Sequence, residues 1–403
     1  MLELFPDTAA VDEAGELTLG GLRATDLAEE HGTPLVVYCE ETIRAQARAY
    51  RGAAPDALVV YGTKAFPNVA ILRLLAEEGI GADVSTLGEL AFAREAGIPP
   101  ERLVVHGNNK SDEELTAARD ALVVLDAPDE LDRARAAGVE RLLVRVTLGI
   151  DADTHEAIRT GHHGSKFGLT EEQARTLIER DRGILGLHIH VGSLLRDAGA
   201  TRAAAAALAR LAATVDGWQP QVLDLGGGLA IRYTLEEHAP SVADFVAAVL
   251  EAAPPVPQVI LEPGRSLVGR AGVTLYRVGA VKETGAGTTY AAIDGGMSDN
   301  PRPQLYASRH TALVAGRAEA QSDGVYGVAG KHCESGDVLI ESVELPSPRR
   351  GDVLAVPATG AYTLGMGSNY NGVPRPAALL VRDGNARVIR RRETVADLLR
   401  YET

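Results

Sequence analysis

The feature that most constrains the fold is a regular alternation of short apolar runs with helical patterns through the first 265 residues. Eight runs have the length and the β-branched content of buried strands. They are residues 57–61, 80–84, 103–106, 122–125, 142–146, 184–190, 222–225 and 259–261. Eight strand–helix repeats in about 250 residues are typical of a (β/α)8 barrel. A doubly wound open sheet is the alternative, and the count of eight favours the closed barrel.

Helix signals lie between these runs. Asn68 can cap a helix over 69–78 that stops at Gly79, and Ser111 begins a capping box. Thr170 precedes a helix over 171–180. Two more helices are predicted over 201–215 and 241–253.

After about residue 270 the pattern changes to short β-rich runs separated by Gly, Pro and Asp. The runs are 273–281, 288–293, 337–345, 352–357 and 377–388. The sequence therefore predicts a barrel domain over 28–267 and an all-β domain, a sandwich or a barrel, over 1–27 plus 268–403. A strand near residues 15–22 is expected to join the β domain.

Composition narrows the class of protein. The net charge of −15 argues against a general nucleic-acid or anionic-membrane binder. No apolar run is long enough to span a membrane, and the first residues lack the features of a signal peptide. Cys39 and Cys333 are the two cysteines, which fits a reducing cytoplasm.

Lysine is rare, because the 40 basic residues include five lysines and 35 arginines. A lysine can act as a neutral amine nucleophile, whereas an arginine stays charged. The five are Lys64, Lys110, Lys166, Lys282 and Lys331. Most lysines are solvated surface residues, but Lys64 follows the first predicted strand, where barrels carry their chemistry.

Other polar residues follow other strands. His188, His190 and Ser193 come with the sixth, a triplet at 226–228 follows the seventh, and 262–265 (EPGR) follows the eighth. Three glycines can make a tight turn or let backbone N–H groups approach a phosphate. A lysine opposite a phosphate loop indicates either a pyridoxal 5′-phosphate (PLP) enzyme or a Schiff-base aldolase. Glu262 favours PLP, since a carboxylate there can keep the pyridine ring protonated.

Two groups of residues remain open to interpretation. His155, His162 and His163 form a cluster without other ligands at a familiar spacing, so a loop is favoured over a metal site and no metal is predicted. Cys333 lies in the polar run HCESGD, which makes an exposed thiol that can donate a proton an alternative to a buried cysteine.

Motifs from about residue 30 onward resemble those of the diaminopimelate decarboxylases. These are PLP enzymes of the alanine-racemase-like barrel fold, in the ornithine/diaminopimelate/arginine decarboxylase family. The motifs are YGTKAF (61–66), HGNNKS (106–111), KFG (166–168), HIHVGS (188–193), DLGGG (224–228), EPGR (262–265), DGGMSDN (294–300), CESGD (333–337) and GAY (360–362). The resemblance implies decarboxylation of meso-2,6-diaminopimelate at its D-centre to L-lysine and CO2, the last step of lysine biosynthesis.

The resemblance also implies roles for individual residues. Lys64 would bind PLP covalently, His190 would stack on the ring and Glu262 would pair with the ring nitrogen. Cys333 would donate the proton. The phosphate would be held by Ser193, Gly227, Gly228, Gly264, Arg265 and Tyr362, and the substrate by Arg265, Arg302, Tyr306, Glu334 and Tyr362. A homodimer would share its active sites, with Cys333 and Glu334 coming from the partner subunit.

Alternatives and departures accompany this prediction. A related decarboxylase of ornithine, arginine or lysine would not need Arg302 and Tyr306. A racemase of this fold would carry Arg in place of Glu262, and a PLP-binding protein without enzyme activity would not need CESGD. Leu194 stands where the family usually has Gln, and Ala230 stands where it has Gly.

Overall fold

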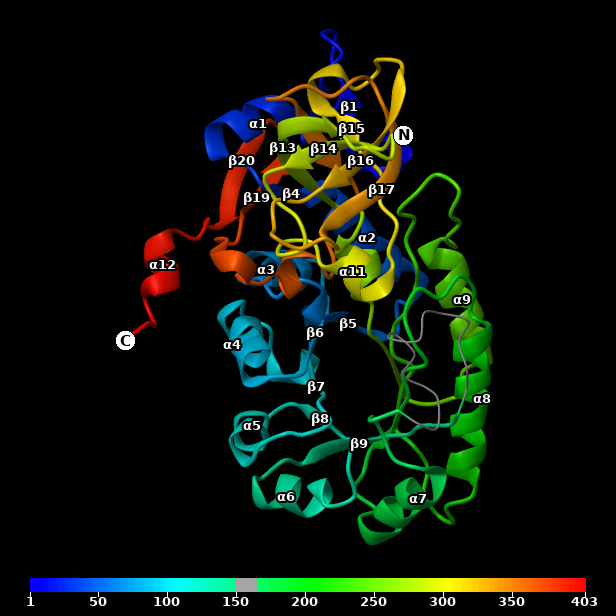
Figure 1. Ribbon diagram of the computed structural model, residues 1–403. Helices are drawn as coiled ribbons and strands as arrows, with labels where there is room; N and C mark the ends of the chain where they lie inside the picture. The colour runs from blue at the N-terminus through cyan, green and yellow to red at the C-terminus, as the bar shows by residue number, and fades with distance from the viewer. Residues whose placement is uncertain (150–164) are drawn as a thin grey trace. The chain divides into compact units, whose positions relative to one another are not determined.

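The computed structural model describes residues 1–149 and 165–403 (Figure 1). The chain divides into two compact units. We call the first the barrel unit, Arg44–Ala230 with His238–Leu267, and the second the β unit, Met1–Ile43 with Ile231–Glu237 and Val268–Thr403. His155, His162 and His163 lie outside the described residues.

The barrel unit contains a closed barrel of parallel strands in chain order, closed by pairing of its last strand with its first. Its strands are β5 (Leu58–Gly62), β6 (Gly81–Val84), β7 (Leu103–Val105), β8 (Leu122–Leu125), β9 (Arg141–Arg145), β10 (Gly186–His188), β11 (Val222–Asp224) and β12 (Gln258–Leu261). Each of the eight predicted runs overlaps one of these strands. The barrel prediction is confirmed, and the open sheet is wrong.

Helices lie around the outside of the barrel strands (Figure 1). They are α2 (Glu40–Ala53), α3 (Val69–Glu77), α4 (Leu87–Glu95), α5 (Asp112–Ala117), α6 (Glu130–Ala136), α7 (Glu171–Arg180), α8 (Gly199–Ala213) and α9 (Val242–Ala252), and the short helix α10 (Arg265–Val268) follows β12. The predicted caps form: Asn68 accepts from two backbone N–H groups of α3, and Ser111 and Thr170 make capping boxes. Each cap sets the residue at which its helix begins after the preceding strand and loop.

The β unit contains two sheets. A small sheet joins β1 (Ala10–Val11), β2 (Leu17–Leu19) and β3 (Leu22–Arg23), so the strand expected near residues 15–22 is present. The main mixed sheet contains β4 (Leu35–Cys39), β13 (Gly272–Glu283), β14 (Thr289–Ile293), β15 (Leu313–Val314), β16 (Gly324–Ala329), β17 (Val338–Leu345), β18 (Val353–Val356), β19 (Ala377–Arg382) and β20 (Asn385–Arg390). Short helices α1 (Ala24–His31), α11 (Arg302–Tyr306) and α12 (Val395–Leu399) complete the unit.

Two details of the main sheet differ from the predicted runs. The run 377–388 is a hairpin, because Asp383 and Gly384 take positive φ and turn the chain between β19 and β20. The second detail is β4, which pairs with both β13 and β19 and was not among the predicted strands.

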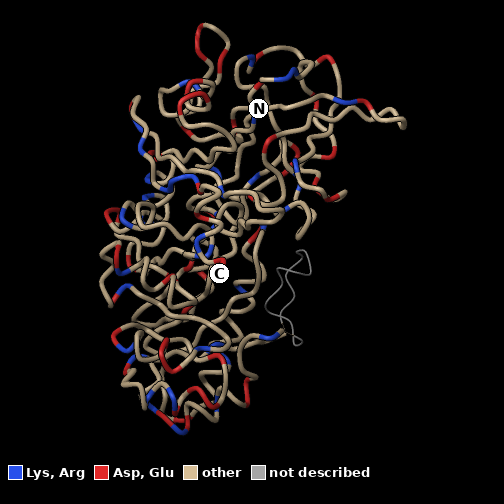
Figure 2. The backbone as a smooth tube through the Cα atoms, turned by 60° about the vertical axis from the view of Figure 1, so that its left-hand side comes forward, with Lys and Arg blue, Asp and Glu red and all other residues tan. Residues whose placement is uncertain are grey.

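Charge is spread along both units. Figure 2 shows acidic and basic residues interspersed along the chain. Within the described residues, no helix is both long and apolar enough to cross a membrane.

Candidate active site

The inner face of the barrel changes from apolar to polar near the carboxyl ends of its strands. Side chains two residues apart on a strand face the same side. The apolar inner layer includes Val60, Val104, Val124, Leu143, Val222 and Ile260. Two residues further along these six strands lie Gly62, His106, Asp126, Arg145, Asp224 and Glu262. The other two strands, β6 and β10, begin with glycine, and two residues after that glycine they carry Asp83 and His188. We call these eight positions the polar layer.

The side chains of the polar layer are buried, with relative exposures of 7% or less. Barrel interiors are ordinarily filled by branched apolar residues, and barrel enzymes carry their chemistry at this end. Buried charges need partners, so the layer must be an interacting network. It is the place in the barrel unit where chemistry is expected.

Lys64 lies at the rim of this layer, in a short 3-10 turn (Thr63–Ala65) after β5. Its Nζ is 2.9 Å from Asp83 Oδ2. The lysine side chain is 50% exposed, whereas the aspartate is 1% exposed. The amine is therefore accessible at the mouth of the barrel and oriented by a buried carboxylate.

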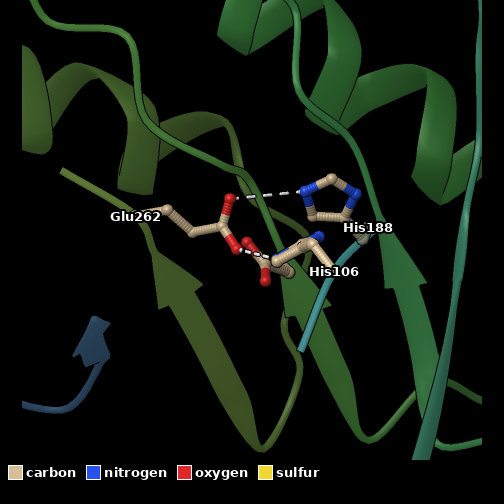
Figure 3. A group of neighbouring side chains, drawn as sticks. His106, His188 and Glu262 are labelled. Carbon is tan, nitrogen blue, oxygen red and sulfur yellow. Dashed lines mark hydrogen bonds and ion pairs between the residues drawn. The ribbon is translucent and has the colours of Figure 1, made fainter. Parts of the chain in front are cut away.

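Glu262 lies just past β12, between two histidines (Figure 3). Its Oε1 is 2.5 Å from His106 Nε2, and its Oε2 is 3.4 Å from His188 Nε2. Burial opposes ionisation of Glu262, but the facing histidines outweigh it, and the pKa of this carboxyl is well below its usual range. Burial lowers the pKa of His188 to about 4, so this ring is neutral near pH 7.

His190 and the glycine triplet form a second part of the site. Gly227 N–H points to His190 Nδ1 at 3.4 Å. Gly226 has φ of +66°, and a Cβ there would lie 2.8 Å from His190 Nδ1. A Cβ on Gly227 would lie 2.1 Å from the Glu262 carbonyl oxygen, so a larger residue does not fit at either position.

Ser193 and Arg265 lie together, because an Arg265 guanidinium N–H donates to Ser193 Oγ at 3.1 Å. Leu194, where the family usually has Gln, takes a φ of +61°. Burial first and the charge of Lys64 second lower the pKa of His190 well below its usual range. His190 is therefore a neutral ring beside the glycine turn.

These residues fit PLP. An accessible amine, a glycine turn that a Cβ would fill and an ionised buried carboxylate match the aldehyde, phosphate and ring nitrogen of that cofactor. His106, His188, Asp224 and Glu262 also offer donor atoms within 4.8 Å of one another, a set that a divalent cation can use. Arg145 already places a positive charge near Glu262, Asp83 and Asp224, so these carboxylates have a cation without a metal.

The remaining predicted site residues belong to the β unit. Arg302 and Tyr306 lie on α11, where the Arg302 guanidinium packs over the rings of Tyr233 (4.7 Å) and Tyr306 (5.9 Å). Arg302 also donates to Ser308 Oγ at 3.0 Å. Tyr362 takes a positive φ of 57°.

Cys333 and Glu334 are exposed on a loop that the rest of the β unit holds firmly. Cys333 N–H donates to Asn371 Oδ1 at 2.9 Å. The buried Asp337 accepts from His332 N–H, pairs with His332 Nδ1 at 2.6 Å, and accepts from Met297 N–H at 2.7 Å. One carboxylate thus joins the CESGD loop to the DGGMSDN loop.

The two units therefore divide the predicted site residues. The barrel unit brings together Lys64, His190, Ser193, Gly227, Gly228, Glu262, Gly264 and Arg265. The β unit holds Arg302, Tyr306, Cys333, Glu334 and Tyr362. Four further residues of the polar layer were given no role on sequence grounds: Asp83, Asp126, Arg145 and Asp224. Continuing the period of two from the apolar layer would have found all four.

Comparison with known proteins places the chain among decarboxylases. The family described as pyridoxal-dependent decarboxylase, pyridoxal binding domain, matches residues 40–269. A diaminopimelate decarboxylase from Actinosynnema pretiosum subsp. auranticum is 46% identical over 411 residues, which cover 97% of this chain and 93% of the relative. The Bacillus subtilis diaminopimelate decarboxylase is 40% identical over 428 residues, covering 98% and 97%. A solved diaminopimelate decarboxylase from M. jannaschii in complex with L-lysine superposes with a TM-score of 0.91 at 32% identity, covering 98% of each chain.

Proposed function

The chain belongs to the pyridoxal-dependent decarboxylases, and from that premise we propose that it converts meso-2,6-diaminopimelate to L-lysine and CO2. CO2 leaves the D-centre, and the reaction is the last step of lysine biosynthesis. The ionised Glu262 held by two histidines across from the accessible amine of Lys64 carries this proposal. The relatives of 46% and 40% identity bear the name of this activity over nearly the whole chain.

The barrel residues bind the cofactor. Lys64 holds it covalently through its amine, and His190 packs on the ring. Ser193, Gly227, Gly228, Gly264 and Arg265 hold the phosphate, together with Tyr362. PLP supplies an electron sink, because its protonated ring accepts the electron pair that the departing CO2 leaves behind.

Glu262 keeps that ring protonated. Its carboxylate is ionised although it is buried, because His106 and His188 face its two oxygens. A negative charge beside a pyridine nitrogen favours the protonated nitrogen. The neutral His188 orients the carboxylate without adding a charge.

The β-unit residues recognise the substrate. Arg302 and Arg265 bind the carboxylate at the far end of diaminopimelate, with Tyr306 beside it, and Glu334 binds the far ammonium group. A guanidinium can bind a carboxylate through two parallel hydrogen bonds. Ornithine lacks that carboxylate and would leave the arginines unpaired, which penalises it as a substrate.

Cys333 donates the proton that replaces the lost carboxylate. Its thiol is exposed and is not part of a disulfide, and its loop is fixed through Asp337 and Asn371. The thiol proton goes to the carbon that lost CO2, and the thiolate takes its proton back from water.

We further propose a cytoplasmic homodimer with shared active sites. In this arrangement Cys333 and Glu334 come from the partner subunit. Two free cysteines in the described chain are compatible with a reducing compartment.

The decisive experiment offers the PLP-loaded protein four amino acids and follows CO2: meso-diaminopimelate, L-ornithine, L-arginine and D-lysine. We expect CO2 from diaminopimelate, with L-lysine formed in equal amount. Release from ornithine but not from diaminopimelate would replace this proposal with a related basic amino acid decarboxylase.

A further inference from the structure

Asp224 is a polar-layer residue for which the proposed reaction has no use. It is the last residue of β11, and it is fully buried. Its Oδ1 accepts from Gly226 N–H at 2.9 Å, at the start of the glycine turn. Its Oδ2 is buried and has no hydrogen-bond partner among the described residues. A buried oxygen of this kind is costly unless it has a function or carries a proton.

The surroundings of Asp224 point to Glu262. Donor and acceptor atoms of Asp224, Glu262, His106 and His188 all lie within 4.8 Å of one another. The Glu262 backbone N–H also donates to the Gly226 carbonyl oxygen at 2.8 Å. Asp224 thus contacts the glycine turn with one oxygen, and its carboxyl group lies beside the Glu262 carboxylate.

We propose that Asp224 is a positioning residue that couples the two ends of the cofactor site, holding the phosphate-binding glycine turn with one oxygen and orienting Glu262 through a proton carried on the other. The inference rests on the proposed function, since it takes Glu262 as the partner of the ring nitrogen. Asp224 acts through Glu262 and Gly226 and does not itself touch the cofactor.

The physical reason is that two buried carboxyl groups this close cannot both be ionised at low cost. Burial, followed by the charge of Glu262, raises the pKa of Asp224 well above its usual range, whereas the pKa of Glu262 is lowered. The proton of the pair therefore stays on Asp224, and the protonated carboxyl can donate toward Glu262. The other titratable groups of the layer and its rim are Lys64, Asp83, Glu89, His106, Asp126, Arg145, His188 and His190.

Two substitutions separate this role from simple packing. In Asp224→Asn the amide oxygen can still accept from Gly226 and the amide N–H can donate to Glu262, so the variant mimics the protonated acid. Asp224→Ala removes both interactions. Glu130→Gln is the control, because Glu130 is an equally buried carboxylate that pairs with Lys110 at 3.0 Å and accepts from Asp126 N–H, outside the Glu262 cluster.

The measurement is the dissociation constant of PLP itself, followed by absorbance and fluorescence from pH 8 down to about pH 3, because the pKa of Glu262 lies well below its usual range. Affinity falls at acid pH as Glu262 takes a proton. We expect Asp224→Ala to weaken PLP binding about 10- to 100-fold at pH 7.5. We also expect the pH below which PLP affinity falls to rise by about one unit, because the loss of a hydrogen-bond donor raises the pKa of the Glu262 carboxylate. The PLP dissociation constants of Asp224→Asn and Glu130→Gln should stay within about threefold of the wild-type value, and the pH below which affinity falls should not change.

Two results overturn the inference. In the first, Asp224→Ala binds PLP with the affinity and the pH dependence of the wild type. In the second, Asp224→Asn binds PLP as weakly as Asp224→Ala does. If Asp224→Ala does not fold, the comparison of Asp224→Asn with the wild type still decides, since a loss of affinity above tenfold contradicts the protonated-acid role. The proposed function fails separately, if the wild-type protein binds PLP but releases no CO2 from diaminopimelate.

Discussion

At the scale of single residues, Lys64 and Lys110 use the same side chain in different ways. Lys110 is 1% exposed, and its Nζ donates to the carbonyl oxygens of Gly107 and Val124 and pairs with Glu130. These contacts fix the loop that begins at His106. Lys64 keeps half of its side chain exposed beside Asp83. Burial with full pairing indicates a structural lysine, whereas an accessible amine beside a buried carboxylate indicates a reactive one.

The amine of Lys64 is testable without removing its charge. Lys64→Arg can keep the ion pair with Asp83, but a guanidinium does not become a neutral nucleophile. We expect turnover to fall by about 10³-fold or more and the borohydride-reducible bond to PLP to disappear, as measured by the mass of the reduced protein. Lys282→Arg, in β13 of the β unit, is the control and should keep both. A cofactor adduct of unchanged yield in Lys64→Arg would contradict the assignment.

Cys333 can be separated from the cofactor chemistry in the same way. Removing a proton donor typically costs about 10²- to 10⁴-fold in rate. For Cys333→Ala we expect a loss in that range with unchanged PLP affinity, measured by CO2 release and cofactor titration. Cys39→Ala is the matched control, because Cys39 is buried among Thr8 and Thr42 and should affect stability alone. Full turnover in Cys333→Ala would exclude the thiol as donor.

The sequence predicted site residues that are rare in this chain or lie in a recognisable motif. Residues whose role depends on their position inside the barrel were not predicted. Lys64 is a rare residue, and Glu262 lies in a recognisable motif. Asp83 is a single acid inside an otherwise apolar strand, and Asp224 received no role of its own although it begins the DLGGG motif. Both side chains belong to the polar layer because they face the barrel interior two residues beyond the apolar layer. The direction in which they face depends on the register of the closed barrel.

At the scale of elements, the barrel strands are close enough to constrain individual glycines. A Cβ on Gly186 of β10 would lie 1.8 Å from the Val222 carbonyl oxygen of β11. These two strands carry His188 and Asp224 two residues further on. The spacing of the strands and the geometry of the polar layer are therefore linked.

Gly186→Ala should disturb both properties at once. We expect a loss of about 2 kcal/mol in the free energy of unfolding, together with weaker PLP binding, because the strands must separate at this point. Gly52→Ala in α2 is the control, since a Cβ there meets nothing within 4 Å and should stabilise the protein by about 0.5 kcal/mol. Urea unfolding and PLP titration measure the two effects. An unchanged PLP affinity in Gly186→Ala would mean that the layer does not depend on this contact.

In the β unit, a buried acid gives stability a pH dependence. Burial raises the pKa of Asp299 to about 7, above the model-peptide value of 3.8. Between these values the folded protein holds a proton that the unfolded chain has lost, so stability falls as pH rises through this window. Asp299→Asn removes the titration but can keep the hydrogen bond from Gly296 N–H.

The stability of Asp299→Asn relative to the wild type should therefore improve by about 2.5 kcal/mol between pH 5 and pH 8, at about 1.4 kcal/mol per pH unit within the window. Urea unfolding at the two pH values measures this difference. An equal difference at both pH values would show that Asp299 is ionised throughout.

The elements themselves were predictable to different degrees. Barrel strands and capped helices follow local patterns, and their bounds agree with the structure to within a few residues. β4 is different, because its five residues are all buried and its partners β13 and β19 are more than 200 residues away. Its partners in the sheet therefore cannot be read from the local sequence.

At the scale of the whole molecule, the division of site residues between two units is the main feature. The proposed cofactor residues other than Tyr362 lie in the barrel unit, and Cys333 and Glu334 lie on an exposed loop of the β unit. An exposed thiol with a well-anchored backbone is what a residue supplied to a neighbouring subunit requires. Twofold symmetric dimers use the same patch on both subunits, so each would complete the site of the other.

This sharing predicts complementation between two inactive variants. Lys64→Ala and Cys333→Ala proteins, co-expressed with different tags, form heterodimers in which one of the two shared sites has both wild-type residues. Because half of a random mixture is heterodimer and half of its sites are intact, we expect about a quarter of wild-type activity. Heterodimers purified through both tags should reach about half, and the separate variants supply the background. Heterodimers with no more activity than that background would show that each subunit uses its own Cys333.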